Sequence, residues 1–197
     1  MARKWSNLNL PGALHFVTGI LLNRQPVFTD SLACWKFLDE LEKLNTKWPS
    51  KLITYVVMPD HFHLIVNPRD GRVREYTGYL KAVVAKSIIK ANTRFIFRKV
   101  EIGHQVWQES FKSLPLWSDW MIWQKINYVH NNPVNAGLVK SAKDYYWSGF
   151  RSFYGMGDDP LAVDHDWWWP DDAEKLKKAM KELGWWGEVN KIRAGKK

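Results

Sequence analysis

An apolar, β-branched run at residues 55–66 is the feature that most constrains the fold of this chain. Such residues favour buried strands, and the Met-Pro-Asp step at 58–60 divides the run into two strands joined by a bend. The second strand begins with His61-Phe62-His63. Successive side chains on a strand point to opposite faces, so both imidazoles share one face, about 7 Å apart along the backbone, and Phe62 points into the core. Two such imidazoles can bind one metal ion; two surface histidines without a ligand are the other interpretation.

Apolar periodicity elsewhere predicts three helices and further strands. The predicted strands span 13–22, 51–57, 61–67, 94–102 and 105–111, and the predicted helices span 31–48, 72–92 and 118–131. Ser31 is the predicted N-cap of the first helix, and Val27-Phe28 is expected to pair with the first strand. The order β-α-β-β-α-β is that of a ferredoxin-like α+β domain, an antiparallel sheet with helices on one face.

The net charge of +9 is unevenly distributed along the chain. Residues 1–154 carry 21 Lys/Arg against 11 Asp/Glu, whereas residues 155–197 carry 8 against 9. The first part is therefore the one expected to bind a polyanion, and we treat 155–197 as a Trp-rich extension that packs on it. Cys34 is the single cysteine, which excludes an internal disulfide and predicts a reducing compartment. No signal peptide or membrane-length apolar run is found, so no membrane association is expected.

Positive charge gathers between residues 69 and 99, where nine Lys/Arg stand against two acidic residues. Basic clusters of this kind contact nucleic-acid phosphates, although a solvated helix face is a common alternative. The residues predicted to contact DNA are Arg69, Arg72, Arg74, Lys81, Lys86 and Lys90.

A second motif, Trp-Gln-Lys-Ile-Asn-Tyr-Val-His-Asn-Asn-Pro-Val-Asn-Ala-Gly-Leu-Val, spans residues 123–139 and places Tyr128 on the third predicted helix. Together with Met-Pro-Asp-His-Phe-His-Leu it resembles the single-tyrosine HUH transposases, and most closely the REP-associated tyrosine transposases of bacteria, over about residues 13–154. Segments 106–111 and 146–148 are similar to weaker signatures of that family. Either main motif alone is a weak signal, but both in this order are a specific one.

The resemblance implies the HUH endonuclease fold, which is ferredoxin-like, and an enzyme that cuts and transfers single-stranded or hairpin DNA. Tyr128 would be the nucleophile and would form a 5′-phosphotyrosine, leaving a free 3′-hydroxyl. His61 and His63 would bind a divalent metal, Mg or Mn, with Asn132 as the third ligand. The resemblance also implies a cytoplasmic, nucleoid-associated bacterial protein whose partner is DNA; both monomer and homodimer stay open.

The third ligand has two interpretations. On an unbroken helix Asn132 lies one turn after Tyr128, on the same face. Pro133 follows it, however, and the residue before a proline avoids helical conformation, so Asn132 could instead cap a turn that begins at Pro133. Gln124 is a further polar candidate, and His130 is predicted to be a surface residue.

Two other function classes stay open. One is a relative that binds DNA hairpins without cutting them, and the other is a metal phosphoesterase that uses water and does not require Tyr128. Trp117, Trp120 and Trp123 repeat every three residues and are predicted to pack the third helix on the sheet. His15, on the first strand, is predicted to be structural.

Overall fold

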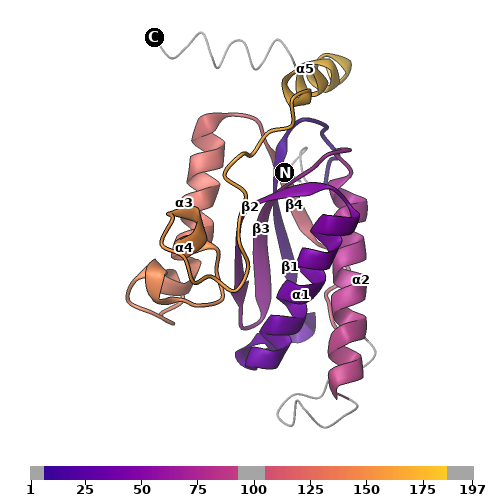
Figure 1. Cartoon of the computed structure of the whole chain (residues 1–197). Coiled ribbons are helices and arrows are strands. Elements are labelled where there is room, and N and C mark those ends of the chain that lie inside the picture. Colours follow the sequence, from indigo (N-terminus) through magenta and orange to yellow (C-terminus); the bar gives the residue numbers. More distant parts are fainter. Residues whose placement is uncertain (1–6, 93–104, 186–197) are drawn as a thin grey trace.

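A four-stranded antiparallel sheet forms the centre of the molecule. The structure is a computed structural model that describes residues 7–92 and 105–185, except for the side chains of residues 91 and 92. The strands, in the spatial order β2-β3-β1-β4, are β1 (Leu14–Ile20), β2 (Ser50–Met58), β3 (His61–Pro68) and β4 (Lys112–Leu116). The main helices are α1 (Ser31–Lys47), α2 (Val73–Asn92) and α3 (Asp119–Asn135). Figure 1 shows the sheet between α1 and α2 on one side and α3 on the other.

The chain order β1-α1-β2-β3-α2-β4 confirms the predicted ferredoxin-like α+β class. β2 and β3 form the predicted hairpin, in which Met58 pairs with His61 across a turn at Pro59-Asp60. Both α1 and α2 cover one face, as predicted, and α3 is an addition on the opposite face. The sheet therefore has a packed layer on each side.

The strand predicted at 105–111 was misplaced. Residues 105–111 form only an isolated bridge, between Leu21 and Trp107, and the fourth strand is Lys112–Leu116. Pro115 hides this strand in the sequence, because proline lacks the N–H that a central strand needs. β4 is an edge strand, where the missing N–H is tolerated. The predicted strand at 94–102 lies wholly outside the described residues.

The segment between β1 and α1 also differs from its prediction. Val27–Thr29 forms a short 3-10 helix instead of a strand, and a similar turn spans Leu22–Arg24. The N-cap of α1 is Asp30, not Ser31, because the Asp30 carboxylate accepts from the backbone N–H groups of the next turn, at 2.8 Å for Leu32. A carboxylate at this position also complements the helix dipole.

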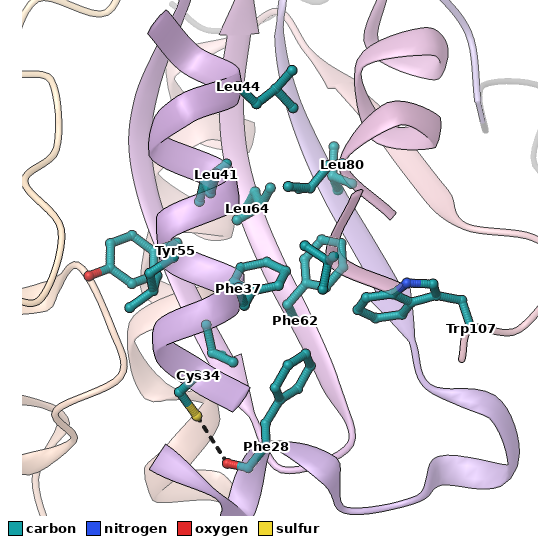
Figure 2. Packing of buried hydrophobic residues seen from close by; sticks show 14 of the residues in the cluster. Phe28, Cys34, Phe37, Leu41, Leu44, Tyr55, Phe62, Leu64, Leu80 and Trp107 are labelled. Atoms are coloured by element: carbon teal, nitrogen blue, oxygen red, sulfur yellow. Dashed lines mark hydrogen bonds between the residues drawn. The ribbon is translucent and has the colours of Figure 1, made fainter. Parts of the chain in front are cut away.

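The larger core lies between the sheet and helices α1 and α2. Phe37 of α1 contacts Phe62 of β3 with their ring centroids 4.8 Å apart, and Figure 2 shows both beside Leu64, with Leu80 of α2 nearby. Phe62 and Leu64 are fully buried on this side. Strand alternation then turns the odd-numbered residues of β3, including both histidines, toward α3.

The smaller core joins α3 to the opposite face of the sheet. Ile122, Ile126 and Val129 are its buried helix residues, and they pack against a set that includes Phe16 and Ile65. The helix is anchored to the sheet by this aliphatic stripe.

The predicted role of the tryptophans in anchoring α3 was therefore wrong for two of them. Trp120 is 61 % exposed and Trp123 is 47 % exposed. They lie outside the stripe of Ile122 and Ile126, which fills the helix side facing the sheet. Trp117, half-buried before the helix, contacts Trp185.

Helix α3 continues through Pro133, beyond its predicted end at residue 131. Ser118 caps its first turn by accepting from the Met121 N–H. The helix stops after Asn135, where Gly137 adopts a left-handed φ of +70°, as is common just past a helix end. Asn132 thus lies inside the helix.

Part of the C-terminal extension covers the outer edge of β2. The Asp164 N–H donates to the Leu52 carbonyl, and the Asp164 carboxylate accepts from the Leu52 N–H, both at 2.7 Å. Such pairing protects an edge strand from association with other chains.

Further segments are Ala142–Asp144, α4 (Phe150–Phe153) and α5 (Asp172–Glu182). A boundary at residue 154 stays a prediction. Among the described helices, none is long and apolar enough to cross a membrane.

Candidate active site

The two histidines of β3 lie side by side on the sheet face that α3 covers. Their ring centroids are 4.9 Å apart, with the rings nearly perpendicular. His63 is 4 % exposed, whereas His61 is partly open to solvent. Strand alternation predicted this pairing on one face, and the depth of His63 follows from its place in the middle of the sheet, between β1 and β2.

Tyr128 reaches the same place from α3. Its ring centroid lies 5.2 Å from that of His63 and 5.7 Å from that of Phe16, in edge-on contacts. Phe16 stacks on His63 at 5.1 Å. Because Tyr128 is 43 % exposed, its hydroxyl-bearing ring sits at the boundary between the packed face and solvent. The structure therefore brings together the central residues of the two motifs.

Both imidazoles are held through Nδ1. The His63 Nδ1 is hydrogen-bonded to the Thr18 hydroxyl at 2.7 Å, and the His61 Nδ1 donates to the Asp60 carboxylate at 2.5 Å. The second oxygen of Asp60 pairs with the Arg24 guanidinium at 2.8 Å. Metal-binding histidines usually have such a partner on the nitrogen that does not bind the metal. In each ring Nε2 is then the nitrogen left for a ligand.

The Nε2 atom of His63 is buried and has no hydrogen-bond partner among the described residues. An unpaired buried polar atom of this kind costs about 1–3 kcal/mol. Burial, with smaller contributions from His61 and Lys125, lowers the pKa of His63 to about 3, so the ring is neutral at pH 7. A neutral imidazole with an unpaired nitrogen is the form that binds a metal.

Within the described residues, the histidine pair is not part of a larger group of acidic, cysteine or histidine side chains. No group of three or more His, Cys, Asp or Glu side chains suited to a metal occurs within residues 7–92 and 105–185. Among these residues the donor set is two imidazoles, and it fits a divalent cation whose shell is completed by amide, phosphate or water oxygens.

Asn132 and Gln124 occupy positions one turn after and one turn before Tyr128 on the continuous helix α3. Both therefore lie on the Tyr128 side of the helix. Asn132 is partly buried and Gln124 is exposed. The interpretation of Asn132 as a cap for a new turn was wrong, because Pro133 continues the same helix. Its role as a metal ligand stays a prediction.

The prediction that His130 is a surface residue was wrong, because its side chain is only 2 % exposed. Its Nε2 is hydrogen-bonded to the Thr54 hydroxyl at 2.8 Å, and its ring contacts Phe150 and Phe153. Burial lowers the pKa of His130 to about 4. No local pattern indicates this burial, because α4, which covers His130, packs on α3 only in the folded chain.

His15 is fully buried, and its Nε2 is hydrogen-bonded to the Leu10 carbonyl at 3.2 Å. Burial lowers the pKa of His15 to about 4. These contacts fit the predicted structural role.

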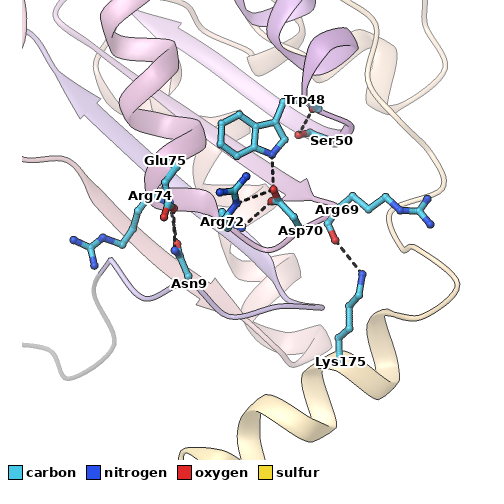
Figure 3. A network of polar contacts seen from close by, with 9 residues as sticks. All are labelled: Asn9, Trp48, Ser50, Arg69, Asp70, Arg72, Arg74, Glu75 and Lys175. Carbon is cyan, nitrogen blue, oxygen red and sulfur yellow. Dashed lines mark hydrogen bonds and ion pairs between the residues drawn. The ribbon is translucent and has the colours of Figure 1, made fainter.

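The basic residues predicted to contact DNA lie on α2, which is across the sheet from Tyr128, or in the segment just before that helix. Figure 3 shows Arg69 and Arg74 reaching outward, while Arg72 turns back onto Asp70, with 2.9 Å between the bonded atoms. The guanidinium of Arg69 also lies 5.0 Å from the Trp169 ring centroid. Exposed members of this cluster are Arg69, Arg72, Arg74, Lys86 and Lys90.

Lys81 is a correction to the DNA-contact prediction. It is 8 % exposed, and its ammonium donates to the Gln108 carbonyl at 2.9 Å and to the Ser110 carbonyl at 3.5 Å. Burial lowers the pKa of the Lys81 ammonium. Lys81 therefore ties α2 to the segment before β4 and does not present its charge at the surface.

Two lysines that the sequence did not single out lie on the side of the sheet that α3 covers. The Lys125 Nζ is 5.2 Å from the ring centroid of Tyr128 and 4.9 Å from that of Phe16. Lys112 is exposed on β4 and pairs with Thr18, which pairs in turn with His63. Lys125 could have been found from its position one turn before Tyr128, whereas Lys112 could not, because β4 was misplaced.

A cavity of about 540 Å³ lies at the N-terminal end of α3, away from these residues. Its lining includes Trp117, Trp168 and Trp169 together with the acidic Asp119 and Glu174. The acidic side chains disfavour a phosphate there, so the cavity is not the place where Tyr128 and the histidines would meet a phosphodiester.

Comparison with known proteins agrees with the two-motif resemblance. Residues 12–132 match the family model described as "Transposase IS200 like". A Haemophilus influenzae protein assigned as a REP-associated tyrosine transposase is 24 % identical over 144 residues, covering 71 % of this chain and 81 % of the relative. A solved structure of a REP-associated tyrosine transposase bound to a REP hairpin superimposes with a TM-score of 0.60 at 20 % identity, covering 86 % of this chain and 96 % of the other. At that identity the structural likeness concerns the fold.

Proposed function

Because this chain belongs to the IS200-like transposase family, we propose that it cleaves and rejoins single-stranded or hairpin DNA through a covalent bond to Tyr128. The observation that carries the proposal is the contact between the Tyr128 ring and His63, whose Nε2 is buried without a partner among the described residues. The relative bound to a REP hairpin supports hairpin DNA as the substrate class.

In the proposed reaction the Tyr128 oxygen attacks a phosphorus atom in line with the bond to the 3′-oxygen. The O–P bond to tyrosine forms and the bond from phosphorus to the 3′-oxygen breaks. The phenol proton leaves to solvent, and the 3′-oxygen takes up a proton. The product is a 5′-phosphotyrosine and a 3′-hydroxyl, so a second 3′-end can reverse the step without ATP.

Several side chains would prepare this step. Thr18 and Asp60 orient the two imidazoles, and Lys125 places a positive charge near Tyr128, where negative charge develops. A divalent cation held by His61 and His63, with Asn132 as a further ligand, would neutralise charge on a non-bridging phosphate oxygen. Tyr128 itself is exposed enough to meet DNA without a rearrangement of α3.

Phosphate contacts would come from two places. Lys112 and Lys125 flank the site itself. The exposed residues Arg69, Arg72, Arg74, Lys86 and Lys90, on α2 and just before it, remain proposed contacts for the paired stem of a hairpin.

The test is the covalent adduct. Labelled hairpin DNA with single-stranded flanks, incubated with Mg or Mn, is expected to give a protein–DNA band that survives denaturing electrophoresis. Tyr128→Phe removes one exposed oxygen, so the adduct should vanish while hairpin affinity stays within about twofold. Tyr79→Phe is the matched control, since Tyr79 is similarly exposed on α2, across the sheet.

Three outcomes would overturn the proposal. An adduct that persists in Tyr128→Phe identifies another nucleophile. Cleavage by the wild type without any adduct identifies a phosphoesterase that uses water. Tight binding without cleavage, with either metal and on flanked hairpins of varied sequence, identifies a hairpin-binding protein.

A further inference from the structure

The solvent-facing side of α3 has an unusual composition. Trp120 and Trp123 are 61 % and 47 % exposed, and at an interval of three residues they are neighbours on the helix surface. In the whole helix, residues 119–135, the charged residues are Asp119 and Lys125. The other exposed polar side chains on the stretch from 120 to 131 are the amides of Gln124, Asn127 and Asn131.

These side chains form two rows that lead to Tyr128. Trp120, Gln124 and Tyr128 follow one another at intervals of four residues, and so lie above one another on the helix surface. Trp123, Asn127 and Asn131 form the neighbouring row. The helix rises 1.5 Å per residue, which separates Trp120 from Tyr128 by about 12 Å, the length of about three stacked nucleotides.

Trp123 is held in place on one side. Its ring contacts Trp167 at 5.7 Å and Phe153 at 6.2 Å, both nearly edge-on. Such support fixes the ring without covering it, since Trp123 remains about half exposed. A rigid aromatic surface loses little conformational entropy when a ligand stacks on it.

We propose that this face of α3 binds the unpaired nucleotides next to the scissile phosphate, with bases stacked on Trp120 and Trp123. The inference rests on the proposed function, because it takes the scissile phosphate to lie at Tyr128. It adds that single-stranded flanks, and not only the hairpin, are bound by the protein.

The chemistry of the face favours unpaired bases over a duplex. A duplex presents phosphates outward and is bound mainly by cations, whereas the two rows offer aromatic rings and amides. Every base has a flat face that stacks on an aromatic ring, and alanine substitution of such a ring costs about 1–3 kcal/mol per base. Amides can donate to and accept from base edges, and Lys125, beside Tyr128, suits the backbone phosphate.

The test compares hairpin binding with and without unpaired bases. Dissociation constants are measured in the Tyr128→Phe background, which prevents cleavage, for a blunt hairpin, the same hairpin with a 5′ or a 3′ single-stranded flank, and flanks built of abasic nucleotides. Trp120→Ala should weaken binding of a flanked hairpin by about 5- to 150-fold and leave the blunt hairpin unchanged. Trp120→Phe should restore most of the affinity.

The abasic flank provides a test that needs no tryptophan variant. It keeps the phosphates and removes the bases, so it should lower the affinity of the Tyr128→Phe protein at least as much as Trp120→Ala does. Adding Trp120→Ala to the abasic flank should lower the affinity no further. Trp35→Ala is the matched control, because Trp35 is 43 % exposed on α1, across the sheet. Thermal unfolding checks that each variant folds.

An abasic flank that binds as tightly as a normal one overturns the inference, as does a Trp120→Ala effect that is equal for blunt and flanked hairpins. The latter outcome would mark the face as a binding surface for the stem or for another protein. These results are independent of the adduct assay. If an adduct forms at Tyr128 but Trp120→Ala and the abasic flank leave binding unchanged, the proposed function holds and this inference fails. If both changes weaken binding of the flanked hairpin but no adduct forms, the binding surface holds and the proposed function fails.

Discussion

Thr18→Val tests how far the histidine pair depends on its hydrogen-bond partners. Thr18 lies on β1 directly opposite His63, and its hydroxyl is bonded to the His63 Nδ1 at 2.7 Å. Valine keeps the β-branched shape of the side chain and replaces the hydroxyl by a methyl group. Since the His63 Nε2 already lacks a partner among the described residues, the variant leaves both ring nitrogens buried and unpaired.

Two effects are expected from this change. A buried polar atom that is deprived of its partner costs about 1–3 kcal/mol, which should appear in the free energy of unfolding of the metal-free protein. The imidazole is also deprived of the hydrogen bond that fixes its tautomer and orientation, and removing such a partner typically weakens metal binding about 10- to 100-fold. The partial exposure of Thr18, 9 %, places the effect on stability toward the lower end of that range.

Urea unfolding measures the first effect, and calorimetric titration with Mn measures the second. Thr18→Ser, which keeps the hydroxyl and removes a methyl group, is the matched control and should retain most of the metal affinity. If Thr18→Val binds metal as tightly as the wild type, the Thr18 bond does not orient His63 as a ligand. If neither variant nor wild type binds Mn at all, the metal interpretation of the histidine pair fails.

Two further predictions concern acid stability and salt. Burial lowers the pKa of His15, His63 and His130 from 6.5 to about 3 or 4. Between about pH 6.5 and 4.5 the unfolded chain therefore binds protons that the folded chain does not. The free energy of unfolding should fall as the pH drops through this window, by up to about 1.4 kcal/mol per pH unit for each histidine. Urea midpoints across this window should show a shallower fall in His130→Asn, and a flat wild-type profile would contradict the burial of these rings. Lys112→Gln combined with Lys125→Gln should flatten the slope of log affinity for the hairpin against log salt by about 0.7–0.9 for each phosphate that is no longer neutralised. Lys81→Met should leave that slope unchanged, and an equal flattening would mean that the Lys81 ammonium reaches DNA.

Local sequence patterns determined the elements that depend on short-range physics. The alternation of β3 alone places His61 and His63 on one face and Phe62 on the other. Apolar periodicity located α1, α2 and the β2–β3 hairpin, and the order of elements identified the ferredoxin-like fold. The two motifs, read together, identified the family.

Tertiary packing decided the rest, because a periodic pattern shows which side of an element is apolar but not what will cover it. The aliphatic stripe of α3 does not by itself specify which surface it packs on. It packs on the sheet face that carries His61 and His63, opposite α1 and α2, and this brings Tyr128 into contact with His63. The same long-range packing buries Lys81 and His130, whose neighbours in sequence suggested the surface. The pairing of β4 with β1 likewise sets Lys112 beside Thr18, through hydrogen bonds between segments far apart in the chain that no local pattern records.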